Sequence, residues 1–165
     1  MKRLFLASLL IFAALLSLAL PVRAEESGFT TVESADGGYV VYYDDGSYLS
    51  VSPVYDVTVA GERGTASTVN GHRDATFTNS DGELEWKYTL YATFSFTYGV
   101  SVTCTNASYS QTIYQGNWTF SNGNATASGA TARGVGHYEK KFLFITIHTV
   151  DVDITLVCDK YGNVT

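Results

Sequence analysis

The side chains that could act as acids or bases are few and scattered along this chain of 165 residues. Asp151 and Asp153 form the best carboxylate pair, because residues two apart on a β-strand project to the same face. Two carboxylates on one face could hydrolyse a glycosidic bond, one acting as general acid and the other as nucleophile or base. We favour the simpler interpretation, in which both are solvated charges on the outer face of a strand.

No other set of residues has the spacing of a catalytic or metal site. His72, His137 and His148 are widely separated, and none has a second ligand at the spacing of a zinc site. Residues 44–46 (Asp-Asp-Gly) carry oxygens that suit Ca²⁺, but they read more simply as a turn. The sequence also lacks serine-nucleophile elbows and phosphate-binding glycine loops. We therefore predict a protein that is not an enzyme and has no catalytic residue, metal or cofactor.

The N-terminus has the features of an export signal. It starts with basic residues, continues with an apolar run over residues 4–20, and offers Val22 and Ala24 at the positions that signal peptidase reads. We predict a cleaved signal peptide over residues 1–24, a flexible lead-in over 25–38, one domain over 39–165, and secretion. An uncleaved anchor is the alternative, although the run is at the short limit for spanning a bilayer.

The predicted mature chain is strongly acidic. The sequence has 10 Lys and Arg and 16 Asp and Glu; Lys2, Arg3 and Arg23 lie in the signal, which leaves 7 basic against 16 acidic residues and a net charge of −9. Nucleic acids and anionic membrane surfaces both require a basic footprint. We therefore expect neither as a partner. No second apolar stretch is long enough to span a membrane.

The two cysteines, Cys104 and Cys158, each end a stretch of alternating apolar residues. Cysteines of exported proteins usually pair, and closing a loop of about 54 residues stabilises the fold by about 4 kcal/mol. We predict a disulfide between them; two thiols are the alternative.

Residues 84–104 carry the clearest secondary-structure signal. Even positions are apolar or aromatic, and odd positions are polar apart from Tyr91 and Gly99. This period of two predicts a strand with one buried and one solvent-facing side. Gly99 marks a bend, a bulge or a tight turn.

Strand and hairpin signals recur along the rest of the chain. Turn residues at 44–46 and 79–82 separate β-rich runs, and residues 150–158 alternate again. Residues 142–147 are nearly continuously apolar, as in a strand covered on both faces or in an oligomer contact. We predict an all-β protein, a single antiparallel β-sandwich of roughly eight to ten strands.

An immunoglobulin-like arrangement is one option for this sandwich. Trp118 follows Cys104 by 14 residues, as a tryptophan follows the first cysteine in immunoglobulin domains. Those domains have a tyrosine two residues before the second cysteine, and here Leu156 stands at that position. The spacing supports a sandwich without showing membership of that class.

Several short motifs resemble a family of small secreted proteins of Gram-positive bacteria whose function is unknown. The motifs are Asn79-x-Asp-Gly-x-Leu-x-Trp86, Ala92-Thr-Phe-x-Phe-x-Tyr-Gly99, Cys104-Thr-x-Ala-Ser108, Trp118, Gly123-Asn-Ala-x-Ala127 and Leu156-x-Cys-x-x-x-Gly162. The resemblance covers roughly residues 39–165 and implies export and a disulfide-linked β domain, but no chemistry. The chain departs from the family pattern after Tyr98, where an Asn-Gly pair is usual.

The tyrosines are the remaining feature that suggests a function. Tyr91 falls on the predicted solvent-facing side with Thr89, Thr93 and Thr97 in register, and a flat row of this kind suits polysaccharide or another protein. The alternative is that the second sheet or the polar segment over residues 108–116 covers this face. We predict a secreted, non-enzymatic extracellular or cell-surface protein with a binding or structural role. The alternatives are a polysaccharide or cell-wall hydrolase using Asp151 and Asp153, and a secreted antagonistic protein or toxin.

Overall fold

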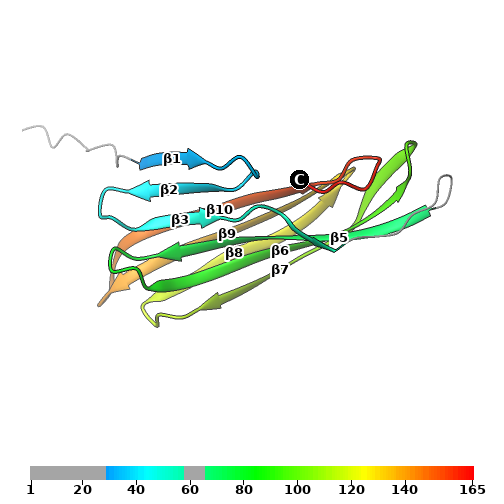
Figure 1. The fold of residues 1–165 in the computed structure, drawn as a ribbon. Helices are drawn as coiled ribbons and strands as arrows, with labels where there is room; N and C mark the ends of the chain where they lie inside the picture. Colours follow the sequence, from blue (N-terminus) through cyan, green and yellow to red (C-terminus); the bar gives the residue numbers. More distant parts are fainter. Residues whose placement is uncertain (1–28, 58–65) are drawn as a thin grey trace, which may run out of the picture.

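The computed structural model describes residues 29–57 and 66–165, so the predicted signal peptide over residues 1–24 lies outside the described residues. These residues form ten strands and no helix, which confirms the all-β prediction (Figure 1). The strands are β1 (Phe29–Glu33), β2 (Tyr39–Tyr43), β3 (Tyr48–Val51), β4 (Tyr55–Val57), β5 (Ala66–Thr78), β6 (Leu84–Thr97), β7 (Ser101–Ile113), β8 (Trp118–Ser128), β9 (Thr131–Phe142) and β10 (Ile145–Val157).

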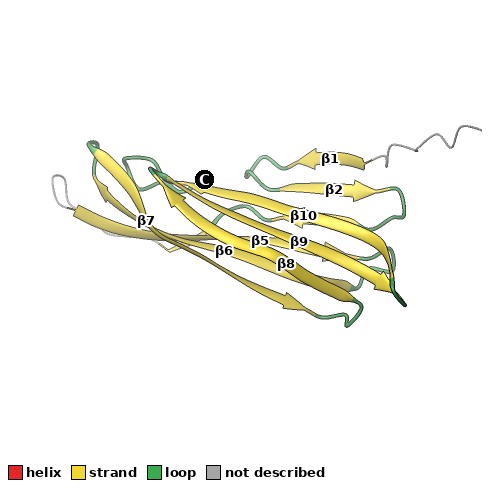
Figure 2. Ribbon diagram, turned by 180° about the vertical axis from the view of Figure 1, so that it is seen from behind, coloured by secondary structure: helices red, strands yellow, loops and turns green. Residues whose placement is uncertain are grey.

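The strands form two antiparallel sheets that lie against each other (Figures 1 and 2). The first has the order β1-β2-β3-β5-β6-β7, with β4 paired along β5, and the second has the order β10-β9-β8. Neighbours in each sheet follow one another along the chain, apart from the insertion of β4, and the chain changes sheet between β7 and β8. This meander differs from the Greek-key connections of immunoglobulin domains. The β-sandwich is confirmed at this coarser level.

The core lies between β6 and the second sheet. From Trp86 onward the even positions of β6 point inward, as their alternation predicts, whereas Leu84 at the start of the strand is exposed; Gly99 occupies a tight turn with a φ of 74° before β7. Apolar side chains of β10 face them across the core, and each such side chain contributes about 1.5–3 kcal/mol when fully buried. The buried members of these two rows are Trp86, Tyr88, Leu90, Ala92, Phe94 and Phe96 on β6, and Val150, Val152, Ile154 and Leu156 on β10.

Two glycines of β9 make room for aromatic rings in this core. A Cβ atom added at Gly136 would lie 2.5 Å from Cε2 of Phe120, and one added at Gly134 would lie 2.7 Å from the hydroxyl of Tyr88. Both distances are shorter than atomic contacts allow, so only glycine lets these rings approach β9 so closely. A third ring, Tyr138 of β9, stacks on Trp86 of β6 with their centroids 3.8 Å apart.

Strand β1 falls inside the segment predicted as a flexible lead-in, residues 25–38. It pairs with β2 over its whole length, from Phe29 opposite Tyr43 to Glu33 opposite Tyr39. All five of its residues are exposed. Strand β1 is therefore held by its pairing with β2 and buries no side chain, and no periodic apolar pattern marks it in the sequence.

The structure differs from the predicted disulfide. Within the described residues no bond joins Cys104 to Cys158, and both side chains are buried. Each sulfur instead lies 3.3 Å from a backbone oxygen no more than two residues away. Burial raises the pKa of the Cys104 thiol, which favours its protonated form. The fold nevertheless brings both cysteines to one turn: the N–H of Cys104 donates to the carbonyl of Gly129 at 2.6 Å, and that of Cys158 to the carbonyl of Ala130 at 3.0 Å.

Candidate functional site

One end of the sandwich gathers the β2–β3, β5–β6, β7–β8 and β9–β10 turns (Figure 1). The β9–β10 turn lies within residues 142–147, for which a strand covered on both faces or an oligomer contact was predicted. The covered strand is wrong, because β9 ends at Phe142 and β10 begins at Ile145, so the apolar run contains a hairpin turn; the oligomer contact stays a prediction. Leu143 takes a φ of 56°, a left-handed conformation that allows the chain to reverse.

The side chains of this turn are strongly exposed. Their exposed fractions are 66% for Phe142, 78% for Leu143, 98% for Phe144 and 68% for Ile145. We call these four residues the apolar tip. Lys141, exposed like the tip, pairs with Thr146 across the hairpin and closes the tip with a polar rung.

A pocket of about 410 Å³ lies beside the base of the apolar tip, between the β2–β3 turn and β10. A register shift between Thr146 and His148 leaves Ile147 as the extra residue of a bulge in β10. Bulges re-aim side chains, and here Ile147 lines the pocket. The residues around the pocket are Tyr43, Asp44, Asp45, Thr146, Ile147, His148 and Thr149.

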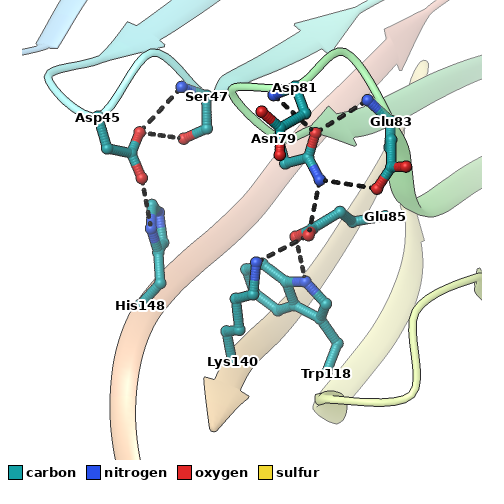
Figure 3. A network of polar contacts seen from close by, with 9 residues as sticks. All are labelled: Asp45, Ser47, Asn79, Asp81, Glu83, Glu85, Trp118, Lys140 and His148. Carbon is teal, nitrogen blue, oxygen red and sulfur yellow. Dashed lines mark hydrogen bonds and ion pairs between the residues drawn. The ribbon is translucent and has the colours of Figure 1, made fainter. Parts of the chain in front are cut away.

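The His148 ring forms the inner side of this pocket. Its Nδ1 atom lies 3.6 Å from Oδ2 of Asp45, and the ring packs edge-on against Tyr43 with centroids 5.2 Å apart. Asp45 also accepts hydrogen bonds from the N–H of Ser47 at 2.9 Å and its hydroxyl at 2.5 Å (Figure 3). The arrangement fixes the β2–β3 turn against β10. It offers a polar ligand one imidazole and one carboxylate, and the one hydroxyl hydrogen-bonded to that carboxylate, on Ser47, is buried.

A buried carboxylate supports the same end of the molecule from inside. Leu84 pairs with Thr78 and Trp86 with Phe77, so Glu85 is the extra residue of a bulge in β6. Its side chain is therefore not on the solvent-facing side that its odd number predicts, and Glu85 is only 2% exposed.

The Glu85 carboxylate joins the two sheets (Figure 3). Oε1 of Glu85 accepts a hydrogen bond from Nζ of Lys140 on β9 at 2.7 Å and from Nδ2 of Asn79 in the β5–β6 turn at 3.4 Å. Oε2 accepts a hydrogen bond from the indole N–H of Trp118 on β8. A buried charge is stable only with such compensation. Sequence reasoning missed this cluster, because alternation alone does not show where a bulge falls.

The residues of the predicted binding face do not behave alike. Tyr91 is 44% exposed, as expected for a solvent-facing ring. Thr89 is buried and donates a hydrogen bond to Asp74 at 2.7 Å. Thr93 and Thr97 are half-buried, and the hydroxyl of Thr93 donates a hydrogen bond to Oδ1 of Asn70 on β5 at 2.8 Å. The row therefore presents one exposed ring rather than a continuous strip of hydroxyls.

The carboxylates Asp151 and Asp153 are both engaged by residues of β9. Oδ1 of Asp151 lies 2.6 Å from Nδ1 of His137. Asp153 accepts two hydrogen bonds from Arg133, at 2.8 and 2.5 Å, and these hold the pKa of Asp153 below its usual value. The general acid of a glycosidase needs a raised pKa. The environment of Asp153 shifts its pKa in the opposite direction.

Neither a metal site nor a membrane span is found in the part of the chain that the structure describes. Over residues 29–57 and 66–165, no three His, Cys, Asp or Glu side chains gather as metal ligands would. Those ranges likewise contain no helix with the length and apolar character needed to cross a bilayer. Comparison with known proteins adds no relative: no family model, curated protein or solved structure matches the chain.

Proposed function

We propose that this protein is a secreted, non-enzymatic extracellular or cell-surface protein that binds its target through the apolar tip. The observation that carries the proposal is the run of four neighbouring apolar side chains, each between 66% and 98% exposed. Contiguous exposed apolar surface usually marks an interaction site. Fully burying one such side chain contributes about 1.5–3 kcal/mol, so the four together could supply useful affinity.

The base of the tip is held rigidly, which lowers the entropic cost of binding. Lys140 is fixed by Glu85 inside the sandwich, and the N–H of Lys141 donates to the carbonyl of Asn117 at 2.9 Å. The β9–β10 hairpin is thereby tied to both β6 and the β7–β8 turn. A preorganised surface loses little conformational freedom when it binds.

Secretion completes the proposal. We expect residues 1–24 to be removed on export and the chain to meet an oxidising environment. A two-electron oxidant there, such as a disulfide oxidoreductase, would take one hydrogen from each thiol of Cys104 and Cys158 as the S–S bond forms. The hydrogen bonds of both cysteines to the consecutive carbonyls of Gly129 and Ala130 support this pairing. Protein from culture medium should then be lighter by two hydrogen atoms and resist alkylation after unfolding; two alkylated thiols would refute the pairing.

The binding proposal is tested with washed Gram-positive cells and protoplasts made from them. The secreted protein and its Phe144→Asp variant are mixed with the cells, sedimented and quantified. Phe144 is 98% exposed, so the substitution should leave the fold intact and lower the affinity at least tenfold. Val100→Asp is the matched control, because Val100 is 73% exposed in the turn after β6, at the other end of the sandwich (Figure 1). Equal binding by both variants would overturn the proposal.

The hydrolase alternative has weaker support, because Asp151 and Asp153 already form pairs with His137 and Arg133. Turnover of peptidoglycan or another glycan that is lost in Asp151→Asn would overturn the non-enzymatic proposal. The third alternative, an antagonistic protein or toxin, rests on size and predicted export.

A further inference from the structure

We infer that the apolar tip inserts into the interfacial region of a phospholipid bilayer and that it favours zwitterionic over anionic lipid. This inference rests on the proposed function and names the target of the same site. It concerns attachment to the surface of a membrane, with the body of the sandwich remaining in water.

The shape of the tip selects this kind of target. Phe142 and Ile145 pair across the hairpin and therefore project to the same face, and both are exposed together with the turn residues Leu143 and Phe144 beyond them. The four apolar side chains are therefore all exposed at the extreme end of the hairpin. A flat protein surface could contact only part of such a protruding end, whereas hydrocarbon can cover all four exposed side chains of an inserted tip.

The length of the tip matches shallow insertion. The turn residues Leu143 and Phe144 lie two positions beyond the rung of Lys141 and Thr146, and a strand rises about 3.3 Å per residue, so the tip extends about 7 Å beyond the rung. Interfacial elements bury their apolar side to a depth of about 5–10 Å. At that depth the polar rung lies among the headgroups, where the alkyl stem of Lys141 can stay apolar while its ammonium group reaches water.

The charges around the tip argue against anionic lipid. Nζ of Lys141 lies 3.1 Å from Glu139 and Nζ of Lys140 lies 2.7 Å from Glu85, so the positive charge of each lysine is balanced by a nearby carboxylate. The carboxylate of Asp45 is exposed at the same end of the sandwich. Residues 25–165 carry 7 basic and 16 acidic residues. A negatively charged surface would therefore repel the protein, and only the apolar contribution favours attachment.

A second copy of the chain is a less suitable occupant. A stable protein–protein interface buries about 1,200–2,000 Å² in total. Two tips of four residues each reach that size only if neighbouring surface joins them, and that surface is polar at the Lys141–Thr146 rung. A bilayer demands no such complementary area.

The test is flotation of the secreted protein with phosphatidylcholine vesicles. Wild type should float with the vesicles, and Phe144→Asp should lower the partition coefficient at least tenfold. Phe144→Leu should retain most of the binding, and Val100→Asp should behave as wild type. Replacing a third of the lipid by phosphatidylserine at low salt should weaken binding severalfold, and binding that rises instead would overturn the preference for zwitterionic lipid.

The same set of variants separates this inference from the proposed function. Absence of vesicle binding by the wild type, with cell binding still lost in Phe144→Asp, would overturn the bilayer as target while the tip remains the binding site. Cell binding that is equal in Phe144→Asp and wild type would overturn the tip itself. Vesicle binding unaffected by Phe144→Asp would also refute insertion of the tip.

Discussion

Replacing Lys140 by Met tests how the two sheets are held together at the binding end. Methionine keeps most of the apolar stem and removes the ammonium group that lies 2.7 Å from Oε1 of Glu85. Glu85 is only 2% exposed, so little water can reach its carboxylate in place of that ammonium group. The hydrogen bonds from Trp118 and Asn79 remain.

The expected loss is large because it leaves a buried charge uncompensated. Removing one partner of a buried ion pair costs about 3–5 kcal/mol. Lys140 also lies 5.8 Å from the centroid of the Trp118 ring, and losing this cation–π contact adds about 0.5–1 kcal/mol. Glu85→Gln should cost less, at most about 2 kcal/mol, because a glutamine oxygen still accepts from Trp118 and the partly exposed lysine can turn to water.

Urea unfolding followed by tryptophan fluorescence measures these differences. With a slope of about 1–3 kcal/mol per molar urea, Lys140→Met should lower the midpoint by about 2 M. Lys141→Met is the matched control, since Lys141 pairs with the partly exposed Glu139 and such pairs contribute about 0–1 kcal/mol. The double variant Glu85→Gln with Lys140→Met should be more stable than Lys140→Met alone. A double variant that is no more stable, or a loss below about 1 kcal/mol in Lys140→Met, would refute the reasoning.

Three further substitutions probe the core, the outer face of the second sheet and the predicted binding face. Gly136→Ala should destabilise the fold by about 1–3 kcal/mol, because its methyl group would lie 2.5 Å from the Phe120 ring; a thermal unfolding curve like that of the wild type would contradict this. The hydrogen bond to Asp151 raises the pKa of His137, so this pair stabilises the protein at low pH and the stabilisation is lost as pH rises through the raised value. Wild type should therefore be more stable than His137→Asn by no more than about 1 kcal/mol at low pH, and this difference should fall toward zero as the pH rises. A difference that grows with pH would exclude the His137–Asp151 pair as its cause. Tyr91→Ser should cost within about 1 kcal/mol in urea, since the ring is 44% exposed, and a loss of 3 kcal/mol or more would mean that the ring is part of the core.

Alternation in the sequence predicted the inner side of β6 because that rule depends only on the pleat of a strand. It also placed a tight turn, bend or bulge at Gly99, where a positive φ is cheapest for glycine. It failed at Glu85, because a bulge adds one residue and changes the face of a side chain without changing the pattern of residue types. The meander order of the strands could not be predicted from the sequence either, since alternation shows which side of a strand is buried and not which strands pair.

The candidate site was hidden by an unusual turn. Most hairpins reverse at Gly, Asn or Asp, and the β9–β10 hairpin reverses at Leu143 and Phe144 instead. Residues 142–147 therefore resembled the interior of a buried strand. The useful signal was the charged pair before the run, Lys140 and Lys141, because a strand covered on both faces rarely continues into two lysines.

Accessibility of a tryptophan placed in the tip tests the central claim most directly. The native Trp86 and Trp118 are 0% and 3% exposed, so acrylamide quenching of the Phe144→Trp variant reports mainly on the tip. We predict strong quenching in the free protein and severalfold weaker quenching once the variant is bound to protoplasts, while Val100→Trp remains equally quenched in both states. Bound protein in which Phe144→Trp is quenched as strongly as in free solution would contradict attachment through the apolar tip.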